Sequence, residues 1–347
     1  MMSAVGSTAA IGPEGGADGL DAIMLRGGDA LRERMARTEL HLERVASRAG
    51  APLAVHANAT ISAGGKRLRP LLVVLAAESA GGPPETPDGE ERLVRAAVAV
   101  ELVHSATLVH DDLIDGAELR RGHPTVATVA GREVAVATGD LLFSRAFAEL
   151  ARNDDQAQLS ALSDASSALA EGELLQREDA YAAHVPVDRY LRRCELKTAA
   201  LFEAACRLGA LAAVEASRGL ADALGAFARR IGLAFQMLDD VLDVSGPVER
   251  TGKSRGTDLL DGTVTLPFIL ARERDRSLAA LDLAGLRDPR DAEQLCERIA
   301  ATGALGEARE RALAVVAEAK AELPSALPDG RAVLLELVAD AVVERYR

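Results

Sequence analysis

Apolar residues along most of this chain recur every three or four positions, which is the spacing of one helix face. Strands would instead alternate apolar and polar residues, and the sequence has no such alternation of useful length and no repeat of 20–50 residues. Glycines and prolines mark the breaks, most clearly in GGPPETPDGEE at 81–91. We expect helices over residues 21–48, 52–63, 71–79, 93–115, 131–152, 156–181, 186–216 and 218–245, a polar loop over 246–263, and further helices with breaks near 288–289, 303 and 324–330.

The stretch 93–115 is apolar nearly all round, which indicates a buried central helix. Its most apolar part, 93–109, is short for a membrane span and is interrupted by Arg95, Glu101 and His104, so we expect no transmembrane segment. Residues 1–20 lack the basic start and the continuous apolar run of a signal peptide, and we expect a disordered tail there. The predicted organisation is therefore a tail over 1–20 and one all-α domain over 21–347.

Composition supports helix, because alanine, leucine, arginine and glutamate dominate and aromatic residues make up only 3% of the 347 residues. A hydrophobic share of 48% is enough for a sizeable core. The net charge of −13 argues against nucleic acid as a partner. Three widely spaced cysteines, Cys194, Cys206 and Cys296, indicate reduced thiols in a cytoplasmic protein, without a zinc site.

Two acidic clusters end long apolar stretches, HDDLID at 110–115 and LDDVLD at 238–243. In each cluster the first and last aspartates are four positions apart, so on a helix they share one face and repel by roughly 0.2–0.5 kcal/mol. One such cluster is more often an exposed helix end, but two that face each other would form a strongly negative pocket. Oxygen ligands suit magnesium, which also bridges to phosphate, so we predict more than one Mg²⁺ and a diphosphate substrate.

Basic residues supply the matching cations, although any one of them alone is more often a solvated surface residue. The segment GGKRLRP at 64–70 is the exception. A glycine turn there precedes a helix start, where backbone N–H groups and the helix dipole already favour an anion. The candidate phosphate contacts are Lys66, Arg69, Arg120, Arg121, Lys197, Thr198 and Lys253.

With these residues in this order, the chain resembles the all-trans isoprenyl (polyprenyl) diphosphate synthases. The resemblance covers roughly residues 50–270 by motif and the rest from about residue 21 by helical pattern. It implies the isoprenoid synthase fold, a single-domain bundle of antiparallel helices around a central substrate cavity. The motifs that carry it are GGKRLRP at 64–70, ELVHSATLVHDDLID at 101–115, RRG at 120–122, KT at 197–198, FQMLDDVLD at 235–243 and GKSRGTDL at 252–259.

The resemblance also implies roles for single residues. The residues that would hold magnesium against the diphosphate of an allylic substrate are Asp111, Asp112, Asp115, Asp239 and Asp243. The residues that would contact the same diphosphate are Arg120, Lys197, Thr198, Gln236 and Lys253. Lys66, Arg69, His104 and Arg121 would bind the diphosphate of isopentenyl diphosphate. His104 lies about two turns before Asp111, so both can face one cavity, although a lone histidine in an apolar helix is more often a core residue. The expected catalytic residues are Asp111, Asp115, Asp239 and Lys197.

The implied reaction is magnesium-dependent, head-to-tail condensation of isopentenyl diphosphate with an allylic diphosphate. Val103, Ala106 and Thr107 precede the first cluster on its helix and are small or medium in size, which favours a medium- or long-chain all-trans product, such as a quinone side chain. Phe143 and Phe147 on the next helix are candidates for the floor of the product tunnel, with ordinary core packing equally open. Geranylgeranyl diphosphate is the alternative product.

Three other kinds of protein are alternatives. A terpene cyclase or a head-to-head synthase would also use aspartate-rich helices, but it needs no GGKRLRP segment or RRG after the first cluster. The binding subunit of a two-component synthase would lose the aspartates, which this chain keeps. The resemblance further suggests a homodimer.

Overall fold

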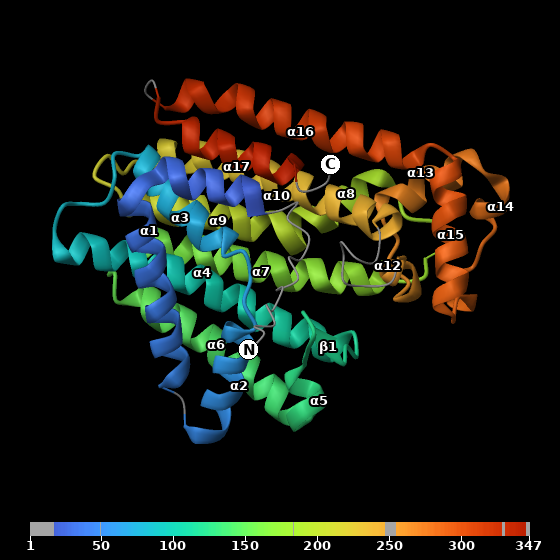
Figure 1. Cartoon of the computed structure of the whole chain (residues 1–347), viewed down its shortest axis with the longest axis horizontal. Coiled ribbons are helices and arrows are strands. Elements are labelled where there is room, and N and C mark those ends of the chain that lie inside the picture. The colour runs from blue at the N-terminus through green and yellow to red at the C-terminus, as the bar shows by residue number, and fades with distance from the viewer. Residues whose placement is uncertain (1–16, 49, 183, 247–254, 328–329, 345–347) are drawn as a thin grey trace, which may run out of the picture.

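The computed structural model describes residues 17–48, 50–182, 184–246, 255–327 and 330–344, and these are almost wholly helical (Figure 1). The first helices are α1 (Ala17–Ser47), α2 (Ala51–Ser62), α3 (Leu68–Ser79), α4 (Pro87–Ile114), α5 (Val126–Ala130), α6 (Arg132–Ala151), α7 (Gln156–Asp179), α8 (Val187–Cys194), α9 (Ala200–Leu211) and α10 (Arg218–Ser245). Then follow α12 (Thr257–Leu260), α13 (Leu266–Arg274), α14 (Arg276–Ala279), α15 (Pro289–Ala301), α16 (Ala304–Ala326) and α17 (Val333–Glu344). The expected all-α fold is confirmed.

Helices α4 and α10 form the centre of the bundle, with α6, α7 and α9 packed along them and α16 along one edge (Figure 1). Helix α4 is buried over most of its length, as its apolar pattern predicted. It begins at Pro87, so half of the loop expected at 81–91 is its first turn. The reason is local: the Thr86 hydroxyl accepts a hydrogen bond from the Gly89 N–H at 3.0 Å, and Pro87 suits the first helical position.

Among the described residues, α4 is the one helix long and apolar enough to cross a membrane. In its most apolar window, 78% of the residues are buried inside the protein, as in the core helix of a bundle.

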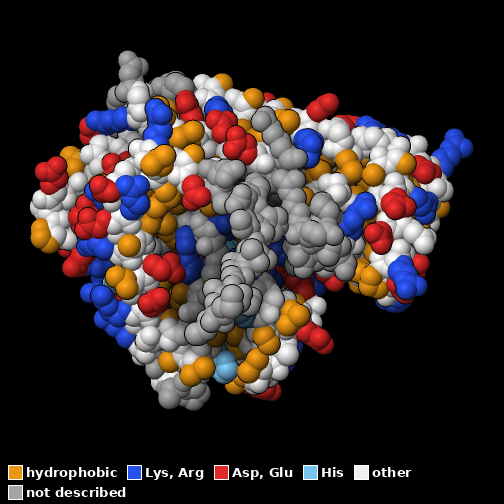
Figure 2. Space-filling model, in the orientation of Figure 1, with side chains coloured by type: hydrophobic (Ala, Val, Ile, Leu, Met, Phe, Trp, Pro, Cys, Tyr) orange, Lys and Arg blue, Asp and Glu red, His pale blue; other side chains and the backbone are white. Residues whose placement is uncertain are grey.

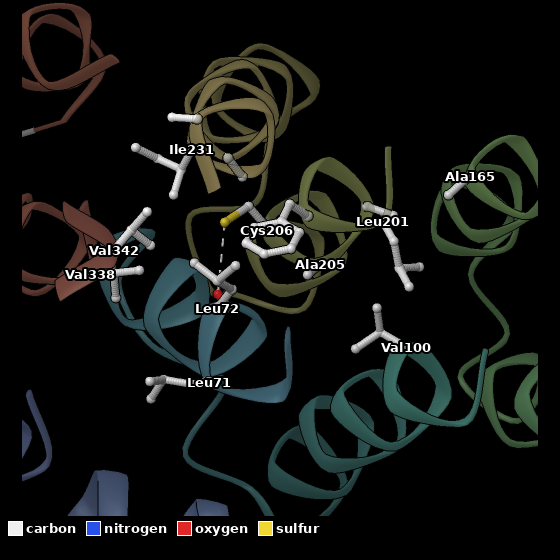
Figure 3. Packing of buried hydrophobic residues seen from close by; sticks show 14 of the residues in the cluster. Leu71, Leu72, Val100, Ala165, Leu201, Ala205, Cys206, Ile231, Val338 and Val342 are labelled. Carbon is white, nitrogen blue, oxygen red and sulfur yellow. Dashed lines mark hydrogen bonds between the residues drawn. The ribbon is translucent and has the colours of Figure 1, made fainter. Parts of the chain in front are cut away.

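Small residues let the core helices approach closely (Figure 3). A side-chain carbon on Gly209 of α9 would come within 2.0 Å of the Val73 carbonyl oxygen of α3, so only glycine fits there. Cys206 lies beside this contact, 3.9 Å from the Leu72 carbonyl oxygen. Cys194, Cys206 and Cys296 are all buried free thiols, which confirms core packing for the first two.

The first helix starts before residue 21, where the sequence predicted the helical domain to begin. Helix α1 begins at Ala17, within the expected tail, and Gly19 packs directly against Ala341 of α17. Gly28, with φ 70°, then bends α1. Residues 1–16 lie outside the described part of the chain, so their disorder stays a prediction.

Three further local elements differ from the expectation. The single helix expected over 186–216 is interrupted by a π-helix, Glu195–Ala199, between α8 and α9. A short hairpin of β1 (Leu119–Arg120) and β2 (His123–Pro124) follows α4. A 3₁₀ turn, Leu283–Gly285, lies between α14 and α15.

Candidate active site

The ends of α4 and α10 that carry the acidic clusters meet at a cavity of about 260 Å³. Asp115, directly after α4, and Asp239 of α10 both line it, so the two clusters face the same space. Helices α7, α8 and α12, the π-helix, strand β1 and the segment after α12 supply the rest of the wall. The full lining is Asp115, Arg120, Gln176, Arg193, Cys194, Lys197, Thr198, Gln236, Asp239, Asp240, Asp258 and Thr263.

Two aspartates of the first cluster are paired with arginines. The buried Asp112 accepts a hydrogen bond from Arg120 Nε at 2.6 Å, across the turn between α4 and β1. Asp115 forms an ion pair with Arg177 of α7. The arginines therefore neutralise part of the negative charge at this end of α4.

Asp111, the first aspartate of the cluster, is crowded by other acids. Burial raises the pKa of its carboxyl to about 6, the ammonium of Lys197 opposes this rise, and the carboxylates of Glu173 and Asp115 add to it. A bound cation would stabilise the ionised form of a carboxylate in such surroundings.

In the second cluster, the middle aspartate is turned into the protein. Asp240 is buried and accepts hydrogen bonds from the Tyr190 hydroxyl at 2.7 Å and from Gln236 Nε2 at 2.8 Å. Burial, and next the charge of Asp258, raise the pKa of Asp240. The same two causes raise the pKa of Asp243, which accepts a hydrogen bond from the Asp258 N–H at 3.3 Å.

The donor set fits magnesium. All the candidate ligands are carboxylates, and burial, together with the charge of neighbouring carboxylates, raises the pKa of two of them, Asp111 and Asp243. Within the described ranges, no three His, Cys, Asp or Glu side chains form a ready-made metal cage. Magnesium ordinarily takes one or two carboxylates together with substrate phosphate and water, so these residues suit an ion that arrives with a diphosphate.

Lys197 and Thr198 enter the cavity from the π-helix. Gly172 of α7 makes this possible, because a side-chain carbon there would come within 2.5 Å of the Lys197 backbone nitrogen. Lys197 Nζ lies 2.5 Å from the Glu173 carboxylate, and the Thr198 hydroxyl donates to Gln236 Oε1 at 2.7 Å. The structure thus places all three predicted contacts, Lys197, Thr198 and Gln236, on one wall.

Several residues of the site were missed by the sequence analysis. Glu173, Gln176 and Arg177 lie on one face of α7, at helical spacings of three and four residues. That charged face was the available signal, but nothing in the sequence connects it to the aspartates. Asp258 was within the quoted segment 252–259 and was not selected.

A second group of cations lies around the GGKRLRP segment. The Arg69 guanidinium stacks over Phe202, with 5.0 Å to the ring centroid, and its Nε has no hydrogen-bond partner in the described structure. Burial lowers the pKa of Arg69 to about 10, an effect that Glu101 opposes and Arg121 reinforces. Gly65 packs against the Arg121 guanidinium, which brings the RRG turn next to this segment. Glu101 already pairs with Arg67 at 2.9 Å, so the charges of Arg69 and Arg121 are suited to binding an anion.

His104 of α4 belongs to the same group. Burial, and then the charges of Arg69 and Arg121, lower the pKa of its imidazole well below the usual value. The ring is therefore neutral near pH 7 and can donate one hydrogen bond. Lys66 lies beside a small apolar pocket formed with Phe235, α1 and α17.

Comparison with known proteins decides the family. The model for polyprenyl synthetases matches residues 52–301, which is most of the chain. The chain belongs to the polyprenyl synthetase family. The resemblance stated from the motifs is thereby confirmed, and so is the enzyme class, prenyl transfer with head-to-tail chain elongation.

Relatives of this polyprenyl synthetase have different product lengths. This chain is 40% identical over 258 residues to heptaprenyl diphosphate synthase component 2 of Geobacillus stearothermophilus, and the match covers 74% of this chain and 78% of that one. It is 36% identical over 292 residues to geranylgeranyl diphosphate synthase of Methanosarcina mazei, covering 82% and 87%. A crystal structure of the polyprenyl synthase of Caulobacter crescentus CB15, complexed with calcium and isoprenyl diphosphate, superposes with a TM-score of 0.85 at 33% identity, covering 94% and 98%.

Lys253 lies outside the described residues. His110, which precedes Asp111 at the start of the first acidic cluster, packs against Gly139 of α6, with Nε2 3.6 Å from Asp140.

The predicted chain-length residues lie where α4 and α6 pack together. Val103 and Ala106 are fully buried, and the Thr107 hydroxyl donates to the His104 carbonyl oxygen at 2.8 Å. Phe143 and Phe147 of α6 pack against the core. None of the five lines the 260 Å³ cavity, so their role stays a prediction.

Proposed function

We propose that this polyprenyl synthetase condenses isopentenyl diphosphate with an allylic diphosphate, with Mg²⁺ bound at the two aspartate clusters. The observation that carries the proposal is the meeting of α4 and α10, which places Asp115 and Asp239 on one cavity with Lys197 and Arg120. The presence of calcium with isoprenyl diphosphate in the Caulobacter complex supports it.

The reaction assigns one task to each group of residues. Magnesium, when held by the carboxylates, supplies positive charge to the allylic diphosphate. Lys197 and Thr198 hold oxygens of this leaving group, whose C–O bond breaks with both electrons passing to the diphosphate. Arg69, Arg121 and the neutral His104 hold isopentenyl diphosphate.

The double bond of isopentenyl diphosphate then attacks the allylic cation, and the new C–C bond lengthens the chain by five carbons. A proton leaves the adjacent carbon for an oxygen of the released diphosphate. The buried apolar face of α4 keeps water away from the cation.

Omission of isopentenyl diphosphate tests the reaction type. A head-to-tail synthase leaves farnesyl diphosphate intact when it is the only substrate, since nothing is present to attack the cation. A terpene cyclase or a head-to-head synthase consumes it. Release of diphosphate from farnesyl diphosphate alone, at the rate seen with both substrates, would contradict the proposal.

We further propose a product longer than farnesyl diphosphate, with geranylgeranyl diphosphate as the alternative. The small side chains of Val103, Ala106 and Thr107 support a long tunnel beside α4. A cytoplasmic homodimer is proposed as well. The buried free thiols support the location, and the exposed apolar side chains of Val136 on α6 and Leu174 on α7 support the dimer.

If Phe147 closes the tunnel, Phe147→Ala should lengthen the main product by at least one five-carbon unit, because the smaller side chain opens space beside α4. Mass spectrometry of the prenyl alcohols after phosphatase treatment measures the length. Leu313→Ala, at an exposed position on α16, is the control and should leave the product unchanged. The same product from wild type and Phe147→Ala would rule out this floor.

Arg177→Gln should lower the Mg²⁺ concentration for half-maximal activity about threefold. Arg177 pairs with Asp115, and a partly exposed ion pair contributes up to about 1 kcal/mol. Mg²⁺ must displace this pair in the wild type but not in Arg177→Gln. Arg189→Gln is the matched control, because Arg189 pairs with Glu178 and Asp179 instead of with the first cluster. A Mg²⁺ requirement that rises or stays the same in Arg177→Gln would show that the pair does not compete with the metal.

A further inference from the structure

A row of basic side chains runs along one face of α1, away from the active site. Arg37, His41 and Arg44 on α1, and Arg48 just after its end, are spaced by four, three and four residues. Figure 2 shows Lys and Arg side chains gathered along the left edge of the molecule, where α1 descends in Figure 1.

This row forms one wall of a cavity of about 290 Å³ between α1, α4 and α6. The opposite wall includes Arg95 of α4 and Arg152 at the end of α6. Five arginines and one histidine therefore converge on one hollow. The full lining is Arg37, Leu40, His41, Arg44, Arg48, Glu91, Val94, Arg95 and Arg152.

The base of the cavity is held by buried polar groups. Arg95 is only 7% exposed, and its guanidinium donates to Asn153 Oδ1 at 3.1 Å and to Glu91 at 2.6 Å. Glu149, 5% exposed, contacts His41 at 2.9 Å and Arg152 at 3.0 Å. Fixed buried partners of this kind make the cavity a preformed site instead of a loose group of surface side chains.

The carboxylates nearby do not balance the arginines. Among the described residues, the acids in contact with the lining arginines are Glu91, Glu149 and Glu90, the last of which lies 3.6 Å from Arg37. Glu90 is already bound by both Nε and a terminal nitrogen of Arg34. In the part of the chain that the structure describes, Arg44 makes no hydrogen bond or ion pair. The cavity thus has a local excess of positive charge on a protein with net charge −13.

We propose that this cavity is a second anion site, which binds a compact phosphoanion such as inorganic diphosphate. Arginine guanidinium groups match phosphate oxygens with paired hydrogen bonds, and several of them around one hollow are typical of phosphate recognition. The site is separate from the active site: Val94, in its wall, precedes Asp111 on α4 by roughly 25 Å at 1.5 Å per residue.

A small free anion fits better than an anionic surface. An extended polyanion or a lipid membrane would also meet the acidic remainder of the molecule and be repelled by it. A compact anion enters the hollow and meets only the arginines. The proposal does not depend on the prenyl transfer reaction, because it concerns binding in the absence of metal and substrate.

Calorimetric titration of the full chain with inorganic diphosphate, at low salt and with a chelator present, tests the site. The variant Arg44→Ser/Arg48→Ser removes two of its exposed cations. Arg26→Ser, an exposed arginine on α1 outside the cavity, is the matched control. Both changes are at exposed positions, and unchanged unfolding temperatures verify that the variants fold.

Wild type and Arg26→Ser should each bind diphosphate in two classes of site, one at the active-site cations and one here. In Arg44→Ser/Arg48→Ser, the dissociation constant for diphosphate at one class of site should rise at least about tenfold. Equal titrations for all three proteins would overturn the proposal. Vesicles containing phosphatidylglycerol distinguish a lipid phosphate from a free one. If the protein binds these vesicles through Arg44 and Arg48 but does not bind diphosphate, the ligand is a lipid headgroup, and the proposal is overturned.

Discussion

Asp111→Asn is expected to lower kcat about a thousandfold, with the protein still folded. The substitution keeps the size of the side chain but removes a charge that would hold magnesium against the leaving diphosphate. Loss of one electrostatic stabiliser of a transition state costs about 3–4 kcal/mol, and a thousandfold is about 4 kcal/mol. Steady-state kinetics with saturating substrates and Mg²⁺ measures the effect.

Stability separates this catalytic effect from misfolding. Burial raises the pKa of Asp111 to about 6, above the value of an exposed aspartate, so above pH 6 the ionised carboxylate destabilises the metal-free fold. Asparagine carries no charge, and metal-free Asp111→Asn should unfold at the same or a higher temperature than wild type at pH 8. Asp140→Asn, a mostly exposed aspartate next to His110, is the control and should keep full activity. A kcat within tenfold of wild type in Asp111→Asn would remove Asp111 from the metal site.

Arg69→Met should raise KM for isopentenyl diphosphate about a hundredfold and leave KM for the allylic diphosphate within about threefold. Arg69 is buried with an unpartnered Nε, beside Arg121 and His104, so its charge is available to an anion there. The loss of a charge-assisted contact of about 3 kcal/mol corresponds to this factor. Methionine retains much of the apolar contact with Phe202.

The same substitution should not destabilise the protein. A buried charge without full pairing is costly, and an apolar side chain of similar length removes that cost. Thermal unfolding of Arg69→Met should occur at or above the wild-type temperature. Equal increases in both KM values would show that Arg69 does not distinguish the two diphosphates, and a large loss of stability would show that its role is structural.

Much of the fold could be predicted from the sequence, because helix ends depend on local chemistry. Gly64-Gly65 follow the end of α2 as expected, whereas α3 begins at Leu68, three residues before its expected start, with Pro70 in its first turn. The start of α4 was placed too late because its first turn is polar, and only the hydroxyl of Thr86 reveals the cap. The π-helix within 186–216 depends on tertiary packing against Gly172, which spacing along one chain cannot show.

The site was predictable where its residues stand in helical register and unpredictable where they come from another helix. Spacing alone brought Asp111 and Asp115 to one end of α4. It could not show that Arg177 of α7 would pair with Asp115, or that Tyr190 would hold Asp240 inside the protein. These contacts join residues 50 or more positions apart, and they require the folded structure.

The most direct test of head-to-tail elongation is to incubate the purified chain, alone, with labelled isopentenyl diphosphate, farnesyl diphosphate and Mg²⁺, and to analyse the products by mass spectrometry. We predict linear prenyl diphosphates longer than the primer by whole five-carbon units, with one diphosphate released for each unit added and no reaction when a chelator removes the metal. A cyclic hydrocarbon, or no elongated product with a correctly folded protein, would contradict the proposed function.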